Sequence, residues 1–149
     1  MKEFITPQII KSEKELDALK EFLSINELPH QDLKLADSLY LTYYNSNDNL
    51  VGSGGLEFYG DKALLRSLAV SQTVRSQRLG QQIVEDLIQQ VMALGKKEVY
   101  LLTTTAFYFF LKFGFTEIKR EEVPDEVKSS TEFSQLCPDS ARVMRLIVN

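Results

Sequence analysis

The feature that most constrains the fold is an apolar strand, a polar loop and an amphipathic helix that follow one another directly. Residues 64–70 predict a buried strand, and residues 71–78 form a short polar loop. The following helix ends at Gly95 and carries an apolar stripe of Leu79, Ile83, Leu87, Val91 and Leu94. Because a helix N-terminus presents unpaired backbone N–H groups at the positive end of the helix dipole, this order suits a phosphate or pyrophosphate.

Three residues of this loop and helix add to the predicted anion site. Arg75 and Arg78 supply cationic donors for the same phosphate. Gly80, in the first turn of the helix, lets the backbone approach a ligand without a Cβ atom in the way. The sequence therefore predicts a phosphorylated ligand over the loop.

The surrounding segments predict an α/β domain of the α+β type, with helices flanking a mixed sheet. Strand-forming runs separated by tight turns indicate an antiparallel meander rather than βαβ units. The predicted strands are 4–10, 39–44, 51–59, 62–70, 98–103, 115–119 and 141–148. The predicted helices are one that Ser12 and Glu15 open as a capping box, a short one over His30 to Asp37, the helix from Leu79, and one over Ala106 to Phe113.

Composition sets bounds on the class of protein. The 149 residues are the length of one domain, 1–149, and the net charge of −4 excludes a strongly basic nucleic-acid-binding surface. No run approaches the roughly 18 apolar residues of a membrane helix. The single cysteine, Cys137, fits a reducing compartment, and one histidine, His30, without a Cys/His cluster predicts no metal site. We therefore expect a soluble cytoplasmic domain.

A hairpin fixes the register of one charged pair. If Gly60-Asp61 is a two-residue hairpin loop, Glu57 opposes Leu64 and Arg66 lies diagonally from Glu57 on the same face. Long side chains span such a diagonal of about 7–8 Å. The same alternation places Ser67 and Ala69 on the opposite face, toward the core or a ligand.

This element order, with Gly114-Phe115 after the last helix, resembles the GNAT family of acyl-CoA-dependent N-acetyltransferases over nearly the whole chain. In the family pattern an Arg or Gln, two residues, a Gly, one residue and a Gly or Ala hold the pyrophosphate. Arg75 and Gly80 match it, whereas Arg78 stands in the place of the first glycine. The resemblance implies a mixed sheet of about six to seven strands and acetyl-CoA as co-substrate. It implies cofactor contacts from Leu68, Ala69, Val70, Arg75, Ser76, Gln77, Arg78, Leu79, Gly80 and Gln81.

Longer strings resemble one branch of that family more specifically. Residues 55–61, 63–70, 100–106 and 132–138 look like the arsenic-resistance N-acetyltransferases. The Leu-Thr-Thr strand end at 102–104 is also similar to the acetylating domain of N-acetylglutamate synthases.

Acetyl transfer from a thioester requires a neutral amine, although a lysine-like amine has a pKa near 10.4. Glu57 is the candidate for the base or for the ligand of the substrate amine, with Arg66 and Ser67 as further catalytic candidates. The alternative is a purely structural Glu57–Arg66 pair across the hairpin. The resemblance implies that the main chain of residues 68–70 stabilises the oxyanion and pairs with the pantetheine arm.

The general acid departs from the family pattern. Many of its enzymes carry a tyrosine four residues before the Gly-Phe glycine, where this chain has Phe110. Tyr108 is predicted to be a packing residue. A water or another side chain could then protonate the leaving thiolate, or no general acid is needed, because a thiolate leaves readily without protonation.

The segment from Glu121 to Ser140 is polar and irregular, and we expect it to fold over the acceptor side as a lid or wall, with a plain crossover as the alternative. Its acidic residues between 121 and 126 are expected near the entrance, favouring a cationic amine. The predicted function is acetyl transfer from acetyl-CoA to a primary amine of a small molecule, an amino acid or analogue, by an enzyme that forms a homodimer. The alternative is a catalytically weak CoA-binding sensor or interaction domain.

Overall fold

The computed structural model describes residues 7–136 and 140–148, and of 75–77 and 135–136 only the backbone. Seven strands form one sheet in the order β1-β2-β3-β4-β5-β7-β6. They are β1 (Pro7–Ile9), β2 (Ser38–Tyr44), β3 (Leu50–Tyr59), β4 (Lys62–Val70), β5 (Glu98–Thr103), β6 (Thr116–Ile118) and β7 (Arg142–Ile147). The predicted meander is confirmed, because β2, β3 and β4 pair antiparallel in sequence order. Only the β4–β5 pair is parallel, so the sheet is mixed.

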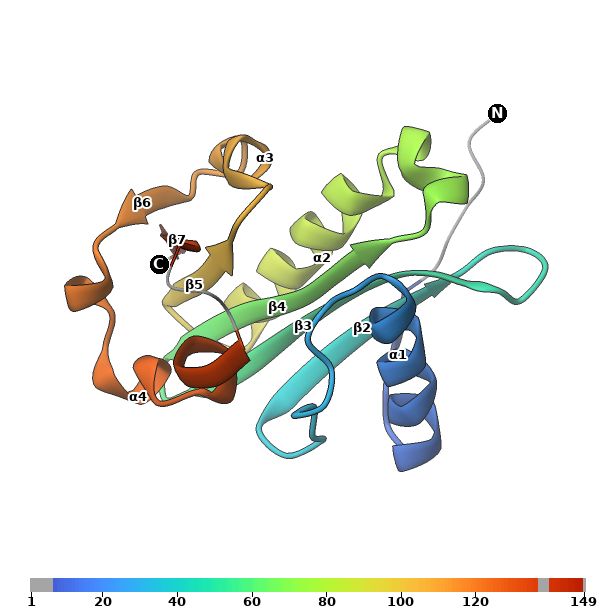
Figure 1. The fold of residues 1–149 in the computed structure, drawn as a ribbon, viewed down its shortest axis with the longest axis horizontal. Coiled ribbons are helices and arrows are strands. Elements are labelled where there is room, and N and C mark those ends of the chain that lie inside the picture. Colours follow the sequence, from blue (N-terminus) through green and yellow to red (C-terminus); the bar gives the residue numbers. More distant parts are fainter. Residues whose placement is uncertain (1–6, 137–139, 149) are drawn as a thin grey trace.

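The helices cover both faces of this sheet. They are α1 (Glu13–Ile25), α2 (Leu79–Ala93), α3 (Phe107–Leu111) and α4 (Asp125–Lys128), with short turns η1 (Gln72–Gln77), η2 (Arg120–Glu122) and η3 (Glu132–Leu136). α2 lies on one face, whereas α1 and the segment that carries α4 and η3 lie on the other (Figure 1). The predicted capping box of α1 is confirmed by the reciprocal bonds between Ser12 and Glu15.

The core follows this division into two faces. The α2 stripe packs on one side of the sheet with residues such as Leu56, Leu65 and Met144. Gly54 of β3 allows this close approach, since a Cβ there would lie 2.6 Å from Ile83 Cγ2. Leu94 does not belong to the stripe, because it caps the helix and is 49% exposed.

Two further clusters cover the other face. One joins α1 to β2 through residues such as Leu19 and Tyr40. The second joins Val127 of α4 and Phe133 of η3 to Leu64, Tyr100 and Val143 of the sheet. The described part of the 121–140 segment is therefore packed against the body as a wall.

The predicted short helix over residues 30–37 is wrong. This stretch runs as turns and bends, held by a single turn-type bond from the Leu33 N–H to the His30 carbonyl. Asp37 adopts a left-handed backbone with φ 53°, which an α-helix does not accept. Leu33 instead anchors the loop in the α1 cluster.

Candidate active site

A wedge opens between β4 and β5. The two strands pair only over Lys62–Leu64 and Glu98–Tyr100, although they continue to Val70 and Thr103. A bulge in β4 marks the region where they separate, because Ser67 and Leu68 together oppose one residue of β3. Ser67 has φ 60°, and its carbonyl accepts a hydrogen bond from Ser53 Oγ at 2.8 Å.

The bulge also corrects one predicted orientation. Gly55 pairs with both Tyr40 and Arg66, so Arg66 lies on the α1 face of the sheet. Ala69 packs in the α1 cluster as well, on the same face as Arg66. The prediction that Ala69 faces the opposite side is wrong, because the extra residue of the bulge reverses the alternation.

A cavity of about 830 Å³ lies at the outer end of the wedge. Its walls come from the end of α1, the end of β4, the start of α2 and α3. They consist of Asn26, Leu28, Leu68, Ala69, Val70, Arg78, Gly80, Gln81, Ala106, Phe109 and Lys112. The first intrahelical bond of α2 runs from the Gln82 N–H to the Arg78 carbonyl, so the amides before Gln82 have no acceptor within the helix.

Arg78 adopts a backbone conformation that glycine accepts more readily than other residues. It lies in the left-handed region with φ 61° and ψ 26°, between η1 and α2. The chain therefore makes the turn with an arginine, whose exposed side chain lines the cavity. At Gly80 a Cβ would lie 3.7 Å from Phe109 Cζ and from Val70 Cγ2, which is ordinary contact.

Six of the predicted cofactor residues line this cavity, namely Leu68, Ala69, Val70, Arg78, Gly80 and Gln81. Leu79 does not, because its side chain is buried in the core beneath. The side chains of Arg75, Ser76 and Gln77 lie outside what the structure describes. Sequence reasoning missed the wall formed by Asn26, Leu28 and α3, since only tertiary packing brings it to the loop.

A second cavity, of about 150 Å³, continues into the wedge and shares Leu28, Leu68 and Ala106 with the first. Arg66, Ser67 and Glu132 contribute polar groups to it. Arg66 Nε and Ser67 Oγ are buried and have no hydrogen-bond partner among the described residues. Buried polar atoms without partners are rare in folded proteins, and here both belong to residues that line one cavity.

Arg66 is the centre of a buried ion cluster. Its Nη1 and Nη2 bind Asp32 Oδ2 and Oδ1 at 2.5 and 2.8 Å, and Nη1 also binds Glu57 Oε2 at 2.9 Å. Glu132 Oε1 lies 3.7 Å from Arg66 Nε. The Arg66 side chain is completely buried. Tyr59 completes the group by donating its hydroxyl to Glu57 Oε1 at 2.9 Å.

Three carboxylates thus share one buried guanidinium. Burial raises the pKa of Glu132 to about 7; the Arg66 charge opposes this shift, while Glu57 and Asp32 add to it. Burial and the Glu57 charge also raise the pKa of the Tyr59 hydroxyl, so Tyr59 remains a donor at neutral pH.

The predicted hairpin register is confirmed, because Glu57 pairs with Leu64 and Gly55 with Arg66. The side chains of Glu57 and Arg66 therefore meet across the diagonal of the hairpin, as predicted. Asp32 and Glu132 were not foreseen. Glu132 lies in residues 132–138, one of the segments that carry the family resemblance. This resemblance is the one sequence signal that pointed to Glu132.

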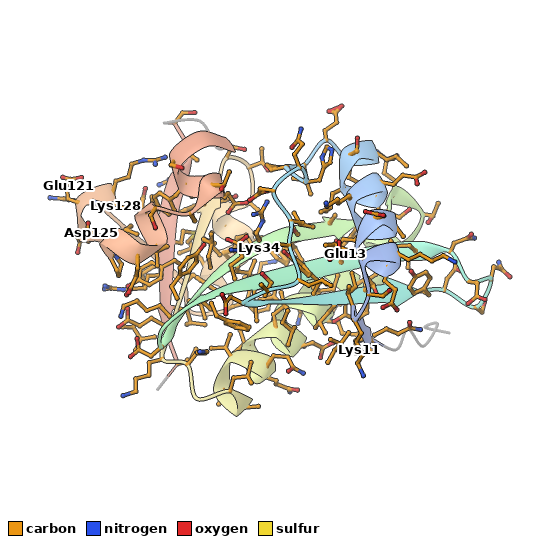
Figure 2. All side chains as sticks on the ribbon, turned by 90° about the horizontal axis from the view of Figure 1, so that it is seen from below. Lys11, Glu13, Lys34, Glu121, Asp125 and Lys128 are labelled. Atoms are coloured by element: carbon orange, nitrogen blue, oxygen red, sulfur yellow. The ribbon has the colours of Figure 1, made fainter. Side chains whose placement is uncertain are left out.

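A third cavity, of about 290 Å³, lies on the α1 face of the sheet. It is lined by Asp32, Lys34, Glu57, Tyr59, Ser129, Ser130 and Thr131. Lys34 lies in the loop above the sheet, whereas Glu121 and Asp125 lie at the outer end of the molecule (Figure 2). The acidic groups at this cavity are therefore Asp32 and Glu57, not the predicted run at 121–126.

The aromatic residues of α3 divide in an unexpected way. Phe110 is buried against Phe115, with ring centroids 5.6 Å apart, and offers no proton. Tyr108 is 75% exposed, so its predicted packing role is wrong; its ring meets that of Phe107 edge-on.

His30 is half-buried, with Nδ1 3.0 Å from the Leu28 carbonyl. Cys137 lies outside the described residues.

Two features are absent from the described residues, 7–136 and 140–148. No group of three or more His, Cys, Asp or Glu side chains there is arranged to hold a metal ion. No helix in the same residues has the length and apolar character needed to cross a membrane.

Comparison with known proteins identifies the family. The sequence model of the acetyltransferase (GNAT) family matches residues 8–115. An uncharacterised N-acetyltransferase of Chlorobaculum tepidum is 33% identical over 79 residues, 52% of this chain and 50% of that protein. The match thus spans half the length of this curated relative.

Solved structures agree on the fold. A GNAT-family acetyltransferase from Staphylococcus aureus superposes with a TM-score of 0.72 at 20% identity, covering 97% of this chain and 100% of that one. The N-acetylglutamate synthase of Neisseria gonorrhoeae, solved with coenzyme A and N-acetyl-glutamate, gives 0.75 at 16% identity, over 100% of this chain and 36% of that one. The mixed seven-stranded sheet, the wedge and the family match lead to one conclusion: this chain belongs to the acetyltransferase (GNAT) family of acyl-CoA-dependent acyltransferases.

Proposed function

We propose that the protein transfers the acetyl group of acetyl-CoA to a primary amine of a small molecule, an amino acid or a close analogue. One observation carries the proposal: the cavities in the wedge between β4 and β5 extend from the N-terminus of α2 to a buried carboxylate cluster. Acetyl transfer to an amine needs both features, a holder for the pyrophosphate and acidic groups for the amine.

The cofactor fits the residues present in the outer cavity. The first amides of α2 and the Arg78 guanidinium are suited to the pyrophosphate, and Gly80 leaves the backbone accessible. The β4 main chain at residues 68–70, beyond the parallel pairing with β5, is suited to the pantetheine arm and to the oxyanion. The coenzyme A bound by the Neisseria gonorrhoeae synthase supports the same co-substrate here. Acetyl-CoA supplies the thioester carbon that the amine attacks, and the thiolate leaves.

The 290 Å³ cavity supports an amino-acid-like acceptor. Asp32 and Glu57 present carboxylates that suit an ammonium group, and Lys34 presents a cation that suits a carboxylate. An acceptor that carries both an ammonium and a carboxylate group, such as an amino-acid zwitterion, suits both sets of charges. Glu57 is proposed as a ligand of the amine, held in place by Arg66 and Tyr59. Membership of the arsenic-resistance branch, a cytoplasmic location and a homodimer stay predictions.

Thiol release from acetyl-CoA over a panel of amino acids and amines tests the reaction. We expect release with at least one α-amino acid or analogue. Glu57→Gln should raise the acceptor KM about tenfold, as expected for one charge-assisted hydrogen bond, and leave acetyl-CoA affinity unchanged. Glu117→Gln, which changes an exposed carboxylate paired with Arg142, is the matched control. Binding of CoA without thiol release from any amine would instead favour the CoA-binding sensor.

A second variant tests the cofactor site alone. The protein accommodates a Cβ at residue 80 at ordinary contact distance, and alanine favours a helix over glycine by about 1 kcal/mol. Gly80→Ala should therefore keep or raise the melting temperature and still bind acetyl-CoA, since the family pattern admits alanine at this position. Gly80→Val should weaken acetyl-CoA binding about tenfold in calorimetry, because its branched side chain meets the ligand. Unchanged affinity in a folded Gly80→Val variant would remove the pyrophosphate from this loop.

A further inference from the structure

We propose that Glu132 is the catalytic base that takes the proton from the acceptor ammonium. The proposal rests on the acetyl transfer proposed above and assigns a step within it. It separates binding of the amine, which Glu57 serves, from its deprotonation.

The other two carboxylates of the cluster are engaged by donors. Both oxygens of Asp32 accept hydrogen bonds from Arg66. Glu57 accepts one from Arg66 on Oε2 and one from Tyr59 on Oε1. The oxygens of both carboxylates thus already accept hydrogen bonds, which hold the two side chains in position to bind a cation.

Glu132 differs from them in its contacts. Among the described residues its charged contact is Arg66 Nε at 3.7 Å, which is longer than a hydrogen bond. Glu132 is one of the residues that line the 150 Å³ cavity in the wedge, together with Ser67 and Leu68 of the bulge. The cavity thus brings this carboxylate to the strand segment where the thioester is proposed to lie.

The electrostatic surroundings favour a base active at neutral pH. Charged groups face Glu132 from three segments: Arg66 from β4, Glu57 from β3 and Asp32 from the loop after α1. Burial raises its pKa to about 7, close to the optimum for a base working near pH 7. The neighbouring anions also favour an incoming ammonium.

The start of η3 fixes the position of this carboxylate. Ser130 Oγ accepts the Phe133 N–H at 3.2 Å, and the Ser130 carbonyl accepts the Ser134 N–H at 2.9 Å. Phe133 is buried in the cluster with Leu64. Glu132 lies between these anchors, which hold its backbone beside the cavity.

The proton balance of the step is complete. The ionised Glu132 carboxylate takes one proton from the R–NH3+ group, and the freed nitrogen lone pair attacks the carbonyl carbon of acetyl-CoA. A C–N bond forms and the C–S bond breaks with its electron pair on sulfur. The second nitrogen proton ends on the thiolate, giving the amide and CoA-SH, and Glu132 returns its proton to solvent.

Glu132→Gln tests the role because the side chain keeps its shape and loses its basicity. With the amine identified in the panel, we expect kcat to fall about a hundredfold or more, the scale of general base catalysis. In a plot of kcat/KM against pH, the acidic limb, which is the rise of kcat/KM with a pKa near 7, should disappear. The affinity for acetyl-CoA should stay unchanged. Glu132→Asp should retain the limb with an intermediate kcat. Glu126→Gln, at the exposed carboxylate that meets Lys62, is the control.

The outcomes distinguish this role from the proposed reaction. An active wild type whose acidic limb persists in Glu132→Gln overturns the role of Glu132 and leaves acetyl transfer intact. A limb lost in Glu57→Gln but kept in Glu132→Gln assigns the base to Glu57. A wild type that releases no thiol with any amine overturns the proposed function and this role together. If Glu132→Gln does not fold, the Glu132→Asp variant decides. A folded Glu132→Asp variant that has the wild-type kcat and an unchanged pKa in its kcat/KM profile overturns the role.

Discussion

The cofactor cavity and the Arg66 cluster are two charged regions built in opposite ways. Six of the eleven residues that line the first come from one stretch of chain, residues 68–81, and they include an exposed arginine. The second joins residues 32, 57, 66 and 132 from four separate segments around a guanidinium that is fully buried. A charge removed from the first region therefore costs ligand affinity, whereas removal of the central Arg66 charge from the second costs stability as well.

The largest effect should come from Arg66→Met, which removes the shared cation and keeps an apolar stem. Three carboxylates would remain around the vacated position without a counter-charge. Breaking a buried pair costs about 3–5 kcal/mol, so we expect the free energy of unfolding in urea to fall by that amount. A loss under 1 kcal/mol would show that the cluster is solvated and that its contrast with the cofactor cavity is false.

A smaller effect should appear in the pH dependence of stability. Burial raises the folded-state pKa of Glu132 to about 7 from an ordinary value of 4.5, so the folded protein holds this proton more tightly. Its contribution to stability is complete below about pH 4.5 and is lost as the pH rises through 7. We expect urea unfolding to show a steeper decline of stability between about pH 5 and 8 in the wild type than in Glu132→Gln. Parallel profiles would contradict the raised pKa.

The smallest effect should come from Arg78, the exposed arginine of the cofactor cavity. Arg78→Asn and Arg78→Gly both remove the charge and tolerate the left-handed backbone. Calorimetry should show acetyl-CoA affinity reduced about threefold to tenfold, with the difference shrinking at high salt because the site is solvated. Arg78→Gly should also unfold at a higher temperature, since relief of the strained backbone is worth about 1 kcal/mol. Stability loss in either variant would place Arg78 in the folding core instead.

Sequence reasoning succeeded where chemistry is local. The Gly60-Asp61 turn fixed the β3–β4 register, and with it the meeting of Glu57 and Arg66. The strand, loop and helix from residue 64 onward formed as expected, because alternation and helical periodicity are encoded over a few residues.

It failed where one residue departs from a regular pattern. Nothing in the type of residue 67 signals the left-handed serine of the β4 bulge, so the faces beyond it were assigned wrongly. Asp32 and Glu132 lie in irregular segments, where no periodicity relates a side chain to the sheet. Their approach to Arg66 depends on how those segments pack.

The sequence by itself determined the order of the strands, the family and the strand, loop and helix of residues 64–93, since each depends on neighbouring residues and their backbone preferences. Only the tertiary structure decided that three carboxylates share one buried guanidinium and that Glu132 faces the wedge. The physical reason is that desolvation and long-range ion pairing depend on distances between segments, and those distances exist only once the two faces of the sheet are covered.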